Sequence, residues 1–393
     1  MSATHILTVN ARTFNVHLNY MFAGTGKDGA PHQRGALADI LAVRPGDNIL
    51  FYVAEHGFYG FFRASQSKRP LVFYEHPTRQ YLDSGLGGKT LTYRFFIEGG
   101  EQGVYRQGVD EWDALENPDR IVDHSVFNMQ WSWIFKKLKG GRGCVSIPEE
   151  EARLLEEIIV RDNVRLRDVR HYTFANGEIA ECAEPHKYEG DTSRMPMLHE
   201  RADIIETEAD LRVFFCSNIG RSDLLGEVVC PDEHGRITFI ANEAKCSFGM
   251  RSIDLLLLSD SNKCLLIELK NTFTFDERFL DQLSGYARWV SSYKRQLTEI
   301  VPILILRAPP LCRRRGGKKF KYLSAEDCDR NVVSPWFKGL VSNFRSLEAE
   351  LRALHIPKLS QLRVVLFQTN DDQRLTGFTF LDLNSKNQLT AKV

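Results

Sequence analysis

Residues 251–270 read RSIDLLLLSDSNKCLLIELK, and this stretch decides how the C-terminal half of the chain folds. Two almost wholly apolar runs flank the short polar segment 259–262, a pattern that predicts a β-hairpin. Strand alternation places Glu268 and Lys270 on one face of the hairpin, because they are two residues apart, and Asp254 can meet Glu268 across it. The three ionisable residues interrupt an otherwise apolar pattern, and we interpret them as a candidate catalytic site.

This residue set suits the hydrolysis of a phosphodiester. Asp254 and Glu268 together offer hard oxygen ligands, which Mg²⁺ (or Mn²⁺) prefers. Lys270 can orient or help to deprotonate an attacking water and can counter the charge that develops on the phosphate. The alternative is a surface ion pair between Glu268 and Lys270 on an edge strand, since the tripeptide Glu-x-Lys is common. The surrounding sequence is therefore needed to decide between a catalytic site and a surface ion pair.

The pattern around the hairpin predicts an α/β domain. Helical spacing starts at Glu206, and an amphipathic helix is expected over 276–293. The expected strands cover 236–241, 252–258, 264–269 and 300–306, and a further helix over 335–354 is followed by a strand over 362–368. Helix, strands, helix and strand is an order typical of mixed α/β domains.

The spacing of Asp254 and Glu268-Leu-Lys270 resembles the PD-(D/E)XK nuclease superfamily. Gln282 and Tyr286 match the QxxxY motif of its RecB-like members, and two residues four apart share one helical face, from which they could reach the site. The same region, about 206–306, also looks like the nuclease domain of mismatch-cleaving endonucleases of the NucS type.

The nuclease domains of that type begin with a glutamate-bearing helix. Glu208 is the candidate for this glutamate, with Glu206 and Glu243 as alternatives. The resemblance implies a metal-dependent endodeoxyribonuclease whose catalytic residues are Asp254, Glu268, Lys270, Gln282, Tyr286 and Glu208, with Asp254 and Glu268 as the metal ligands.

The first part of the chain is rich in short aromatic and β-branched runs broken by glycine. Strands are expected at 4–9, 48–53, 58–64 and 91–97, with a helix over 36–43, and we interpret the region as a small mixed β barrel. Most of its large rings are expected to form the barrel core. Some could instead stack on a flipped base, because every base offers a π face.

An ordered set of motifs in this part resembles the EVE branch of the PUA-like fold, which is related to YTH readers. The set includes Arg44-Pro-Gly-Asp47 before an apolar strand, and Trp131-Ser-Trp133 before Gly141-Arg-Gly143. The resemblance covers about 1–158 and implies a reader of modified cytosine or adenine. By position, the candidates for the modified-base pocket are Asn19, Tyr20, Tyr52, Trp131 and Trp133.

Two local basic stretches could contact a nucleic-acid backbone. The chain as a whole is neutral, with 51 Lys and Arg against 51 Asp and Glu, so any attraction to phosphate must be local. The alternatives are a solvated face for the first stretch and a flexible surface loop for the second. The candidate contacts are Lys136, Lys137, Lys139, Arg142, Arg313, Arg314, Arg315, Lys318 and Lys319.

The sequence thus predicts a multidomain α/β protein with a base-reading domain over 1–160, a connecting region over 161–200 and a nuclease domain with a C-terminal extension over 201–393. No apolar run is long enough to span a bilayer, and the first residues lack an export signal, so we expect a cytoplasmic protein without a membrane partner. The 8 cysteines are spread without metal-binding or disulfide spacing.

The combination implies a modification-dependent restriction endonuclease acting on double-stranded DNA in phage defence. Double-strand cleavage by one metal site per chain would favour a homodimer. The alternatives are a mismatch or damage repair endonuclease, a non-catalytic nucleic-acid-binding protein, and an RNA-processing enzyme.

Overall fold

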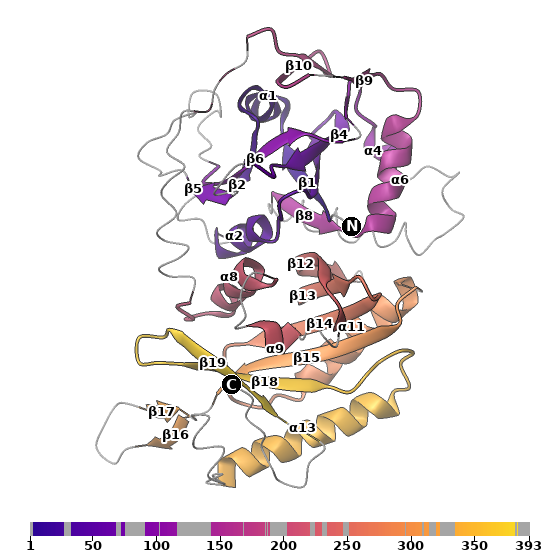
Figure 1. Ribbon diagram of the computed structural model, residues 1–393. Helices are drawn as coiled ribbons and strands as arrows, with labels where there is room; N and C mark the ends of the chain where they lie inside the picture. Colours follow the sequence, from indigo (N-terminus) through magenta and orange to yellow (C-terminus); the bar gives the residue numbers. More distant parts are fainter. Residues whose placement is uncertain are drawn as a thin grey trace. The chain divides into compact units, whose positions relative to one another are not determined.

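The computed structural model divides the chain into two compact units (Figure 1). Unit 1 comprises Met1–Leu198 and Phe239–Met250, and unit 2 comprises His199–Thr238 and Arg251–Val393. Both units combine helices and strands, so the expected multidomain α/β class is confirmed. The structure describes residues 3–26, 33–67, 72–74, 91–101, 103–115, 143–167, 169–184, 186, 188, 203–220, 225–229, 234–246, 251–294, 296–308, 310–313, 320–322, 335–381 and 383.

Unit 1 is built on a seven-stranded sheet with the order β2-β6-β4-β3-β1-β8, in which β5 also pairs with β6. β1 and β3 run parallel, and the other neighbours whose register is given are antiparallel. The strand bounds are β1 Thr4–Val9, β2 Phe22–Thr25, β3 Asn48–Val53, β4 Gly57–Ala64, β5 Val72–Tyr74, β6 Tyr93–Gly99 and β8 Cys144–Ile147. The four strands expected from the sequence are all present, two of them at the expected bounds.

The two edge strands of this sheet approach each other. Gly143, immediately before β8, packs against Thr25 at the end of β2, and a Cβ atom at position 143 would lie 2.0 Å from Thr25 Oγ1. Only glycine leaves room for so close an approach of backbone and side chain. The sheet therefore curls around its core, in which Phe51 packs against Phe14 and Phe62 with ring centroids 5.0 and 5.5 Å away.

Helix α1 (Ala11–Tyr20) was not expected from the sequence. A capping box between Asn10 and Thr13 starts it. Its buried face includes the polar residues Thr13 and His17 beside Phe14 and Leu18, so the apolar period was obscured. The other helices of unit 1 are α2 (Gln33–Leu41), α4 (Glu111–Leu115) and α6 (Glu149–Val160). α2 overlaps the helix expected over 36–43.

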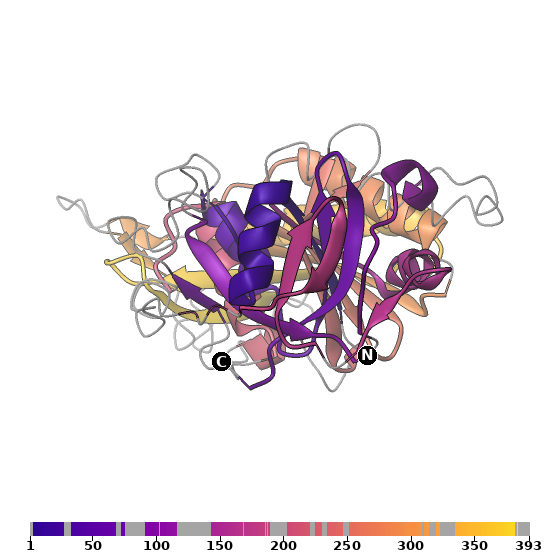
Figure 2. The same cartoon turned by 90° about the horizontal axis from the view of Figure 1, so that it is seen from above.

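Part of the region expected to be a linker belongs to unit 1. β9 (Arg165–Leu166) pairs with β7 (Val104–Tyr105), and β10 (Tyr172–Ala175) forms a hairpin with β11 (Glu178–Glu181). The hairpin lies beside α1 (Figure 2), where Asn15 Oδ1 accepts hydrogen bonds from Phe174 N at 2.8 Å and Thr173 Oγ1 at 3.0 Å. These strands are too short for a sustained apolar period, which is why the sequence indicated only a connection.

Five strands of the second, six-stranded sheet, in the order β13-β14-β15-β18-β19, belong to unit 2, and its edge strand β12 belongs mainly to unit 1. The pairs β13–β14 and β18–β19 are antiparallel, whereas β14–β15 and β15–β18 are parallel. The bounds are β12 Ile237–Cys246, β13 Arg251–Ser259, β14 Lys263–Lys270, β15 Glu299–Arg307, β18 Arg363–Thr369 and β19 Leu375–Leu381. β19 was not expected, and a separate pair is formed by β16 (Pro310–Arg313) and β17 (Phe320–Tyr322).

The parallel pairs are joined by helices, as parallel strands require. α11 (Arg278–Tyr293) connects β14 with β15, and α13 (Pro335–Ala353) lies between β15 and β18 in the chain. Phe279 of α11 and Phe344 of α13 belong to one buried cluster with Leu304 and Leu366 of the sheet. α8 (Glu208–Asn218) and the short α9 (Gly226–Val229) precede the sheet.

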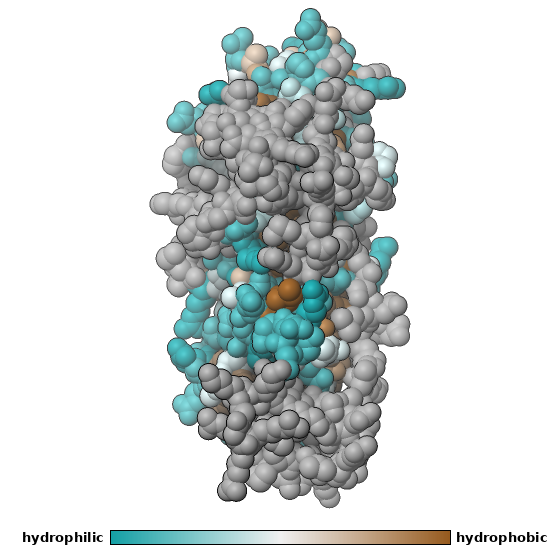
Figure 3. Space-filling model, turned by 90° about the vertical axis from the view of Figure 1, so that its left-hand side faces the viewer, coloured by the Kyte–Doolittle hydropathy of each residue, from teal (hydrophilic) through white to brown (hydrophobic). Residues whose placement is uncertain are grey.

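The surface is predominantly polar where it is described. In the view of Figure 3 most of the coloured residues are hydrophilic. The large hydrophobic side chains that are exposed among the described residues are Val160, Val164 and Phe273. Within the same residues, no helix is long and apolar enough to cross a membrane.

The buried His17 leads to a prediction about stability and pH. Burial, with a smaller contribution from Arg94, lowers the pKa of His17 to about 3, against 6.5 for an ordinary histidine. Between pH 6.5 and 3 the unfolded chain therefore binds a proton that the folded chain does not. The free energy of unfolding thus decreases as the pH is lowered through this window. His17 should remove about 3 kcal/mol of unfolding free energy between pH 7 and pH 4.

Chemical denaturation of the protein and of His17→Leu at both pH values measures this contribution. The variant should lose less stability on acidification than the wild type. An equal loss in the two proteins would contradict the prediction.

Candidate active site

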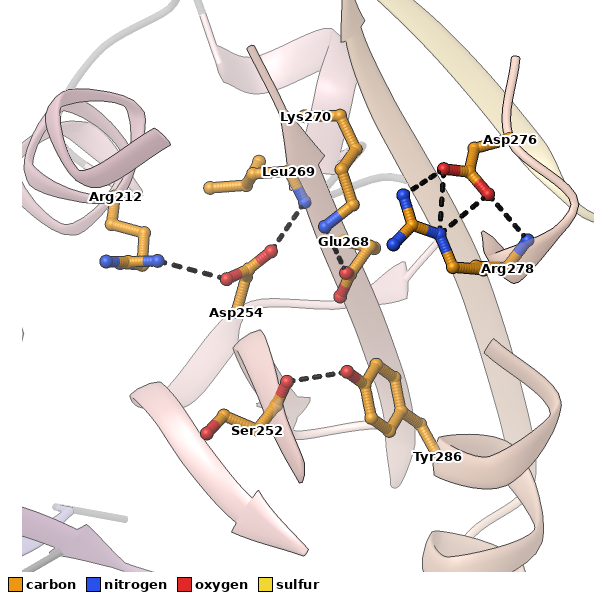
Figure 4. Close-up of polar contacts among 9 residues, drawn as sticks. All are labelled: Arg212, Ser252, Asp254, Glu268, Leu269, Lys270, Asp276, Arg278 and Tyr286. Carbon is orange, nitrogen blue, oxygen red and sulfur yellow. Dashed lines mark hydrogen bonds and ion pairs between the residues drawn. The ribbon is translucent and has the colours of Figure 1, made fainter. Parts of the chain in front are cut away.

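The hairpin of β13 and β14 brings the predicted carboxylates together. Its register sets Leu255 opposite Ile267, and the next pair in the same register is Asp254 opposite Glu268. Directly opposed residues of an antiparallel pair point to the same face. Both residues are buried, at 8% and 2% relative exposure, and Lys270 lies beside them on β14 (Figure 4).

Three of the four carboxylate oxygens of Asp254 and Glu268 accept hydrogen bonds from described residues. Asp254 Oδ2 accepts from the backbone N–H of Leu269 at 2.9 Å, and its Oδ1 accepts from Arg212 Nη1 at 3.1 Å. Glu268 Oε1 accepts from Lys270 Nζ at 2.5 Å. Glu268 Oε2 is buried and has no hydrogen-bond partner among the described residues. A buried acceptor without a partner is costly and calls for an explanation.

The electrostatics of the site follow from this crowding. Burial, then the charge of Asp254 and to a smaller extent that of Glu208, raises the pKa of Glu268 to about 8, although Lys270 opposes the shift. Burial tends to lower the pKa of Lys270, but Glu268, Asp254 and Glu208 together outweigh it and raise that pKa above its ordinary value. Lys270 is therefore an ammonium group at neutral pH.

Helix α8 is fixed next to β14 by a buried arginine. Arg307 Nη2 donates to the carbonyl of Ile205 at 2.7 Å, and its Nη1 donates to Thr369 Oγ1 at 2.8 Å. Thr207 then caps the helix in a capping box with Asp210. These contacts hold the first turn of α8, which carries Glu208, at the end of β14.

The structure distinguishes among the three candidate glutamates. Glu208 is the first residue of α8 and contributes to the electrostatics of both Glu268 and Lys270. Glu206 is exposed, and its carbonyl accepts a hydrogen bond from Asn271 Nδ2 at 2.5 Å. Glu243 lies in β12 and, like Glu206, is not among the described charges that shift the pKa of Glu268. Of the three, Glu208 is thus the one whose charge is described as acting on Glu268 and Lys270.

Gln282 and Tyr286 both lie in α11. The hydroxyl of Tyr286 donates to the carbonyl of Ser252 at 2.7 Å, two residues before Asp254 in β13. Tyr286 is buried at 2% relative exposure, so it ties α11 to the strand that carries the aspartate. Gln282 is partly exposed, one turn earlier on the same helix. The predicted helical face is present, and Tyr286 reaches the backbone beside the site.

Sequence reasoning missed Arg212. It lies four residues after Glu208, so the two share a face of α8. Its guanidinium holds Asp254 Oδ1 from the side opposite to β14 (Figure 4). The helical spacing from Glu208 was the available signal, but an arginine at this spacing is too common to be selected without the fold.

The donor set fits a small divalent cation. Among the described residues no group of three or more His, Cys, Asp and Glu side chains is arranged to hold a metal ion. Mg²⁺, however, is commonly bound by one or two carboxylates, with waters and substrate oxygens completing its shell. The opposed Asp254 and Glu268 and the buried, unpartnered Glu268 Oε2 meet that requirement. A cation there would also relieve the repulsion between the two carboxylates.

The candidates in unit 1 do not all converge. Tyr20 stacks on His186, with ring centroids 5.1 Å apart, and lines a cavity. The hydroxyl of Tyr52 instead donates to Glu111, and the buried Asn19 Oδ1 has no hydrogen-bond partner among the described residues. Neither Tyr52 nor Asn19 lines that cavity. Trp131 and Trp133 lie outside the described residues.

Most of the predicted backbone contacts also lie outside the described residues. They are Lys136, Lys137, Lys139, Arg142, Arg314, Arg315, Lys318 and Lys319. Arg313 is the last residue of β16.

Comparison with known proteins adds no relative. The chain matches neither a model of a protein family nor a curated protein. The candidate site therefore stands on its own geometry.

The crowded carboxylates lead to a prediction about stability without metal. In a chelating buffer at neutral pH, Glu268→Gln should raise the free energy of unfolding by roughly 1–3 kcal/mol, because the raised pKa of Glu268 means that the folded chain must take up a proton there that the unfolded chain does not hold, and glutamine needs none. Denaturant titration measures the change. Glu299→Gln is the matched control, since Glu299 pairs with Lys263 at 2.8 Å: partial burial tends to raise the pKa of Glu299, but this partner outweighs it and lowers that pKa. The control should lose up to about 1 kcal/mol, and a loss in both variants would contradict the prediction.

Proposed function

We propose that the protein is a modification-dependent restriction endonuclease that hydrolyses phosphodiester bonds of double-stranded DNA with Mg²⁺ or Mn²⁺. The observation that carries the proposal is the buried pair Asp254 and Glu268, with Lys270 alongside and one carboxylate oxygen unpartnered. Two buried carboxylates held together cost stability, and a metal-dependent reaction is a physical reason to keep them.

The residues have separable tasks in such a reaction. Asp254 and Glu268 would hold the cation, and Lys270, kept charged by Glu268, would donate to a phosphate oxygen and counter its developing charge. The bound cation would supply Lewis-acid polarisation and a more acidic water. Arg212 fixes one oxygen of Asp254, and Tyr286 fixes the strand beside it. Because Lys270 is an ammonium group, its contribution is positive charge rather than proton abstraction.

The arrangement of unit 2 supports the nuclease interpretation. A helix with a glutamate in its first turn precedes an antiparallel hairpin with the Asp and Glu-x-Lys residues, and a helix with Gln282 and Tyr286 leads to a parallel strand. This is the order that the resemblance to PD-(D/E)XK nucleases implies. We therefore propose a PD-(D/E)XK core for this unit.

The sheet of unit 1 supports the proposal of a PUA-like reader. Its edge strands β2 and β8 approach closely at Thr25 and Gly143, as a nearly closed barrel requires. Such a domain would supply the target selection that a bare metal site lacks. The rival proposal, a repair endonuclease, differs in its substrate and is separated from this one by the cleavage assay below.

The first test is metal binding. Mg²⁺ should raise the thermal unfolding midpoint of the wild type, because it binds the folded state alone, and the rise should grow with Mg²⁺ concentration. Asp254→Asn should abolish most of this rise, whereas Glu299→Gln should retain it. An equal rise in Asp254→Asn would remove the basis for a metal site at the hairpin.

The second test is cleavage of matched duplexes that carry cytosine, 5-methylcytosine, 5-hydroxymethylcytosine or N6-methyladenine. With Mg²⁺, we expect cleavage of at least one modified duplex and little of the unmodified one. Asp254→Asn, Glu268→Gln and Lys270→Met should each lower the rate by at least about 100-fold, since each removes a group acting on the reacting phosphate. Equal cleavage of modified and unmodified DNA would contradict restriction, and preference for mismatched duplexes would favour repair.

A further inference from the structure

Unit 1 contains a large cavity, and of the residues predicted for a base pocket only Tyr20 is among its described lining residues. Its volume is about 1110 Å³, which is ample for a nucleotide. It is lined by β6 with the turn that follows it, which form its first wall, and by the segment from β9 to the start of β10, which forms its second. Figure 1 labels these strands. The second wall lies in the region that the sequence indicated to be a linker. Tyr20, at the end of α1, also lines the cavity.

The wall from β9 to β10 is cationic. It contributes Arg165, Arg167 and Arg170, all of them exposed. Arg165 donates to the carbonyl of Glu101 at 2.7 Å. Arg167 and Arg170 have no ion-pair partner among the described residues, so their charges are available to a ligand. Two guanidinium groups three residues apart are suited to phosphate oxygens.

The other side of the cavity offers planar surfaces and one acceptor. The ring of Tyr20 stacks on that of His186 with an angle of 19° between the planes. Tyr188 packs edge-on against Phe96, and its hydroxyl is held by Arg94 Nη1 at 3.0 Å. A base could stack against this aromatic side.

Glu98 on β6 supplies the acceptor. Its carboxylate accepts from Ser65 Oγ at 3.1 Å and from Gln66 N at 3.4 Å, which orients it in the cavity wall. A carboxylate has about four acceptor positions, so it can still accept a hydrogen bond from a ligand. An exocyclic amine of a base can donate to a carboxylate, and cytosine, adenine and guanine carry this group whereas thymine lacks it.

We propose that this cavity binds a nucleotide with an amino-bearing base: the base stacks on the free face of the Tyr20–His186 ring pair, Glu98 accepts from its amino group, and Arg167 and Arg170 bind its phosphates. The inference rests on the proposed function in one respect, namely that the nucleotide comes from duplex DNA by base flipping. A free nucleotide has the same chemistry, and the experiment distinguishes the two sources.

The experiment measures binding by the full chain in a chelating buffer, so that cleavage does not interfere. The probes are modified and unmodified duplexes, and dCMP, dAMP and dTMP. The double variant Arg167→Gln/Arg170→Gln should weaken duplex binding for all sequences and lower the slope of log affinity against log salt by about 2, one for each phosphate contact. Arg153→Gln/Arg161→Gln, a double variant at two exposed arginines outside the cavity, is the control with the same charge change.

The base contacts have their own variants. Tyr20→Ala should weaken binding by about tenfold or more, and Tyr20→Phe, which keeps the ring, should restore it. Glu98→Gln should reduce the preference for cytosine or adenine over thymine. Thermal unfolding of each variant verifies that it is folded.

These outcomes separate the two proposals. Duplex binding with the expected losses supports both the cavity and the reader. Binding of dCMP or dAMP with the same losses, but no binding of duplexes, supports the cavity and contradicts the reader. Unchanged binding in folded Tyr20→Ala and in the double arginine variant would overturn the inference.

Discussion

The repulsion between two buried carboxylates is the constraint on which unit 2 depends. Asp254 and Glu268 face each other across the hairpin, and burial with this repulsion raises the pKa of Glu268 to about 8. The surrounding groups reduce the cost in different ways: Leu269 and Arg212 donate to Asp254, and Lys270 donates to Glu268. Only Asp254 has both its oxygens engaged by these contacts. The unpartnered oxygen of Glu268 is the position at which the proposed cation would bind.

The elements around the hairpin are arranged to keep this geometry. Arg307 is buried at 9% relative exposure and bonds Ile205, Thr369 and Gln373, so it joins the start of α8 to the far side of the sheet. Losing it would release the first turn of α8 and leave several buried acceptors unpaired. Tyr286 performs the corresponding task for α11. The polar groups of unit 2 thus position the site as well as form it.

Local pattern was enough to predict the hairpin but not all of its neighbours. The alternation around Glu268 and Lys270 predicts one face for both, and the antiparallel register places Asp254 on it. Arg212 and Arg307 were not predicted, because their partners lie 42 and 102 residues away in the chain. In unit 1, α1 was missed because polar residues lie on its buried face. Long-range hydrogen bonds and polar cores leave no periodic signal.

The charged segment that lines the unit 1 cavity was also not predicted from local sequence. Arg165, Arg167 and Arg170 lie in charged, irregular sequence, whose composition alone suggested a connecting segment. β9 and the hairpin that starts with β10 hold this segment against β7 and α1, through main-chain pairing and the two bonds to Asn15. Short strands thus give this charged segment a fixed place in unit 1. That place depends on partners distant in the chain, such as Glu101, which lies 64 residues before Arg165, and not on the composition of the segment.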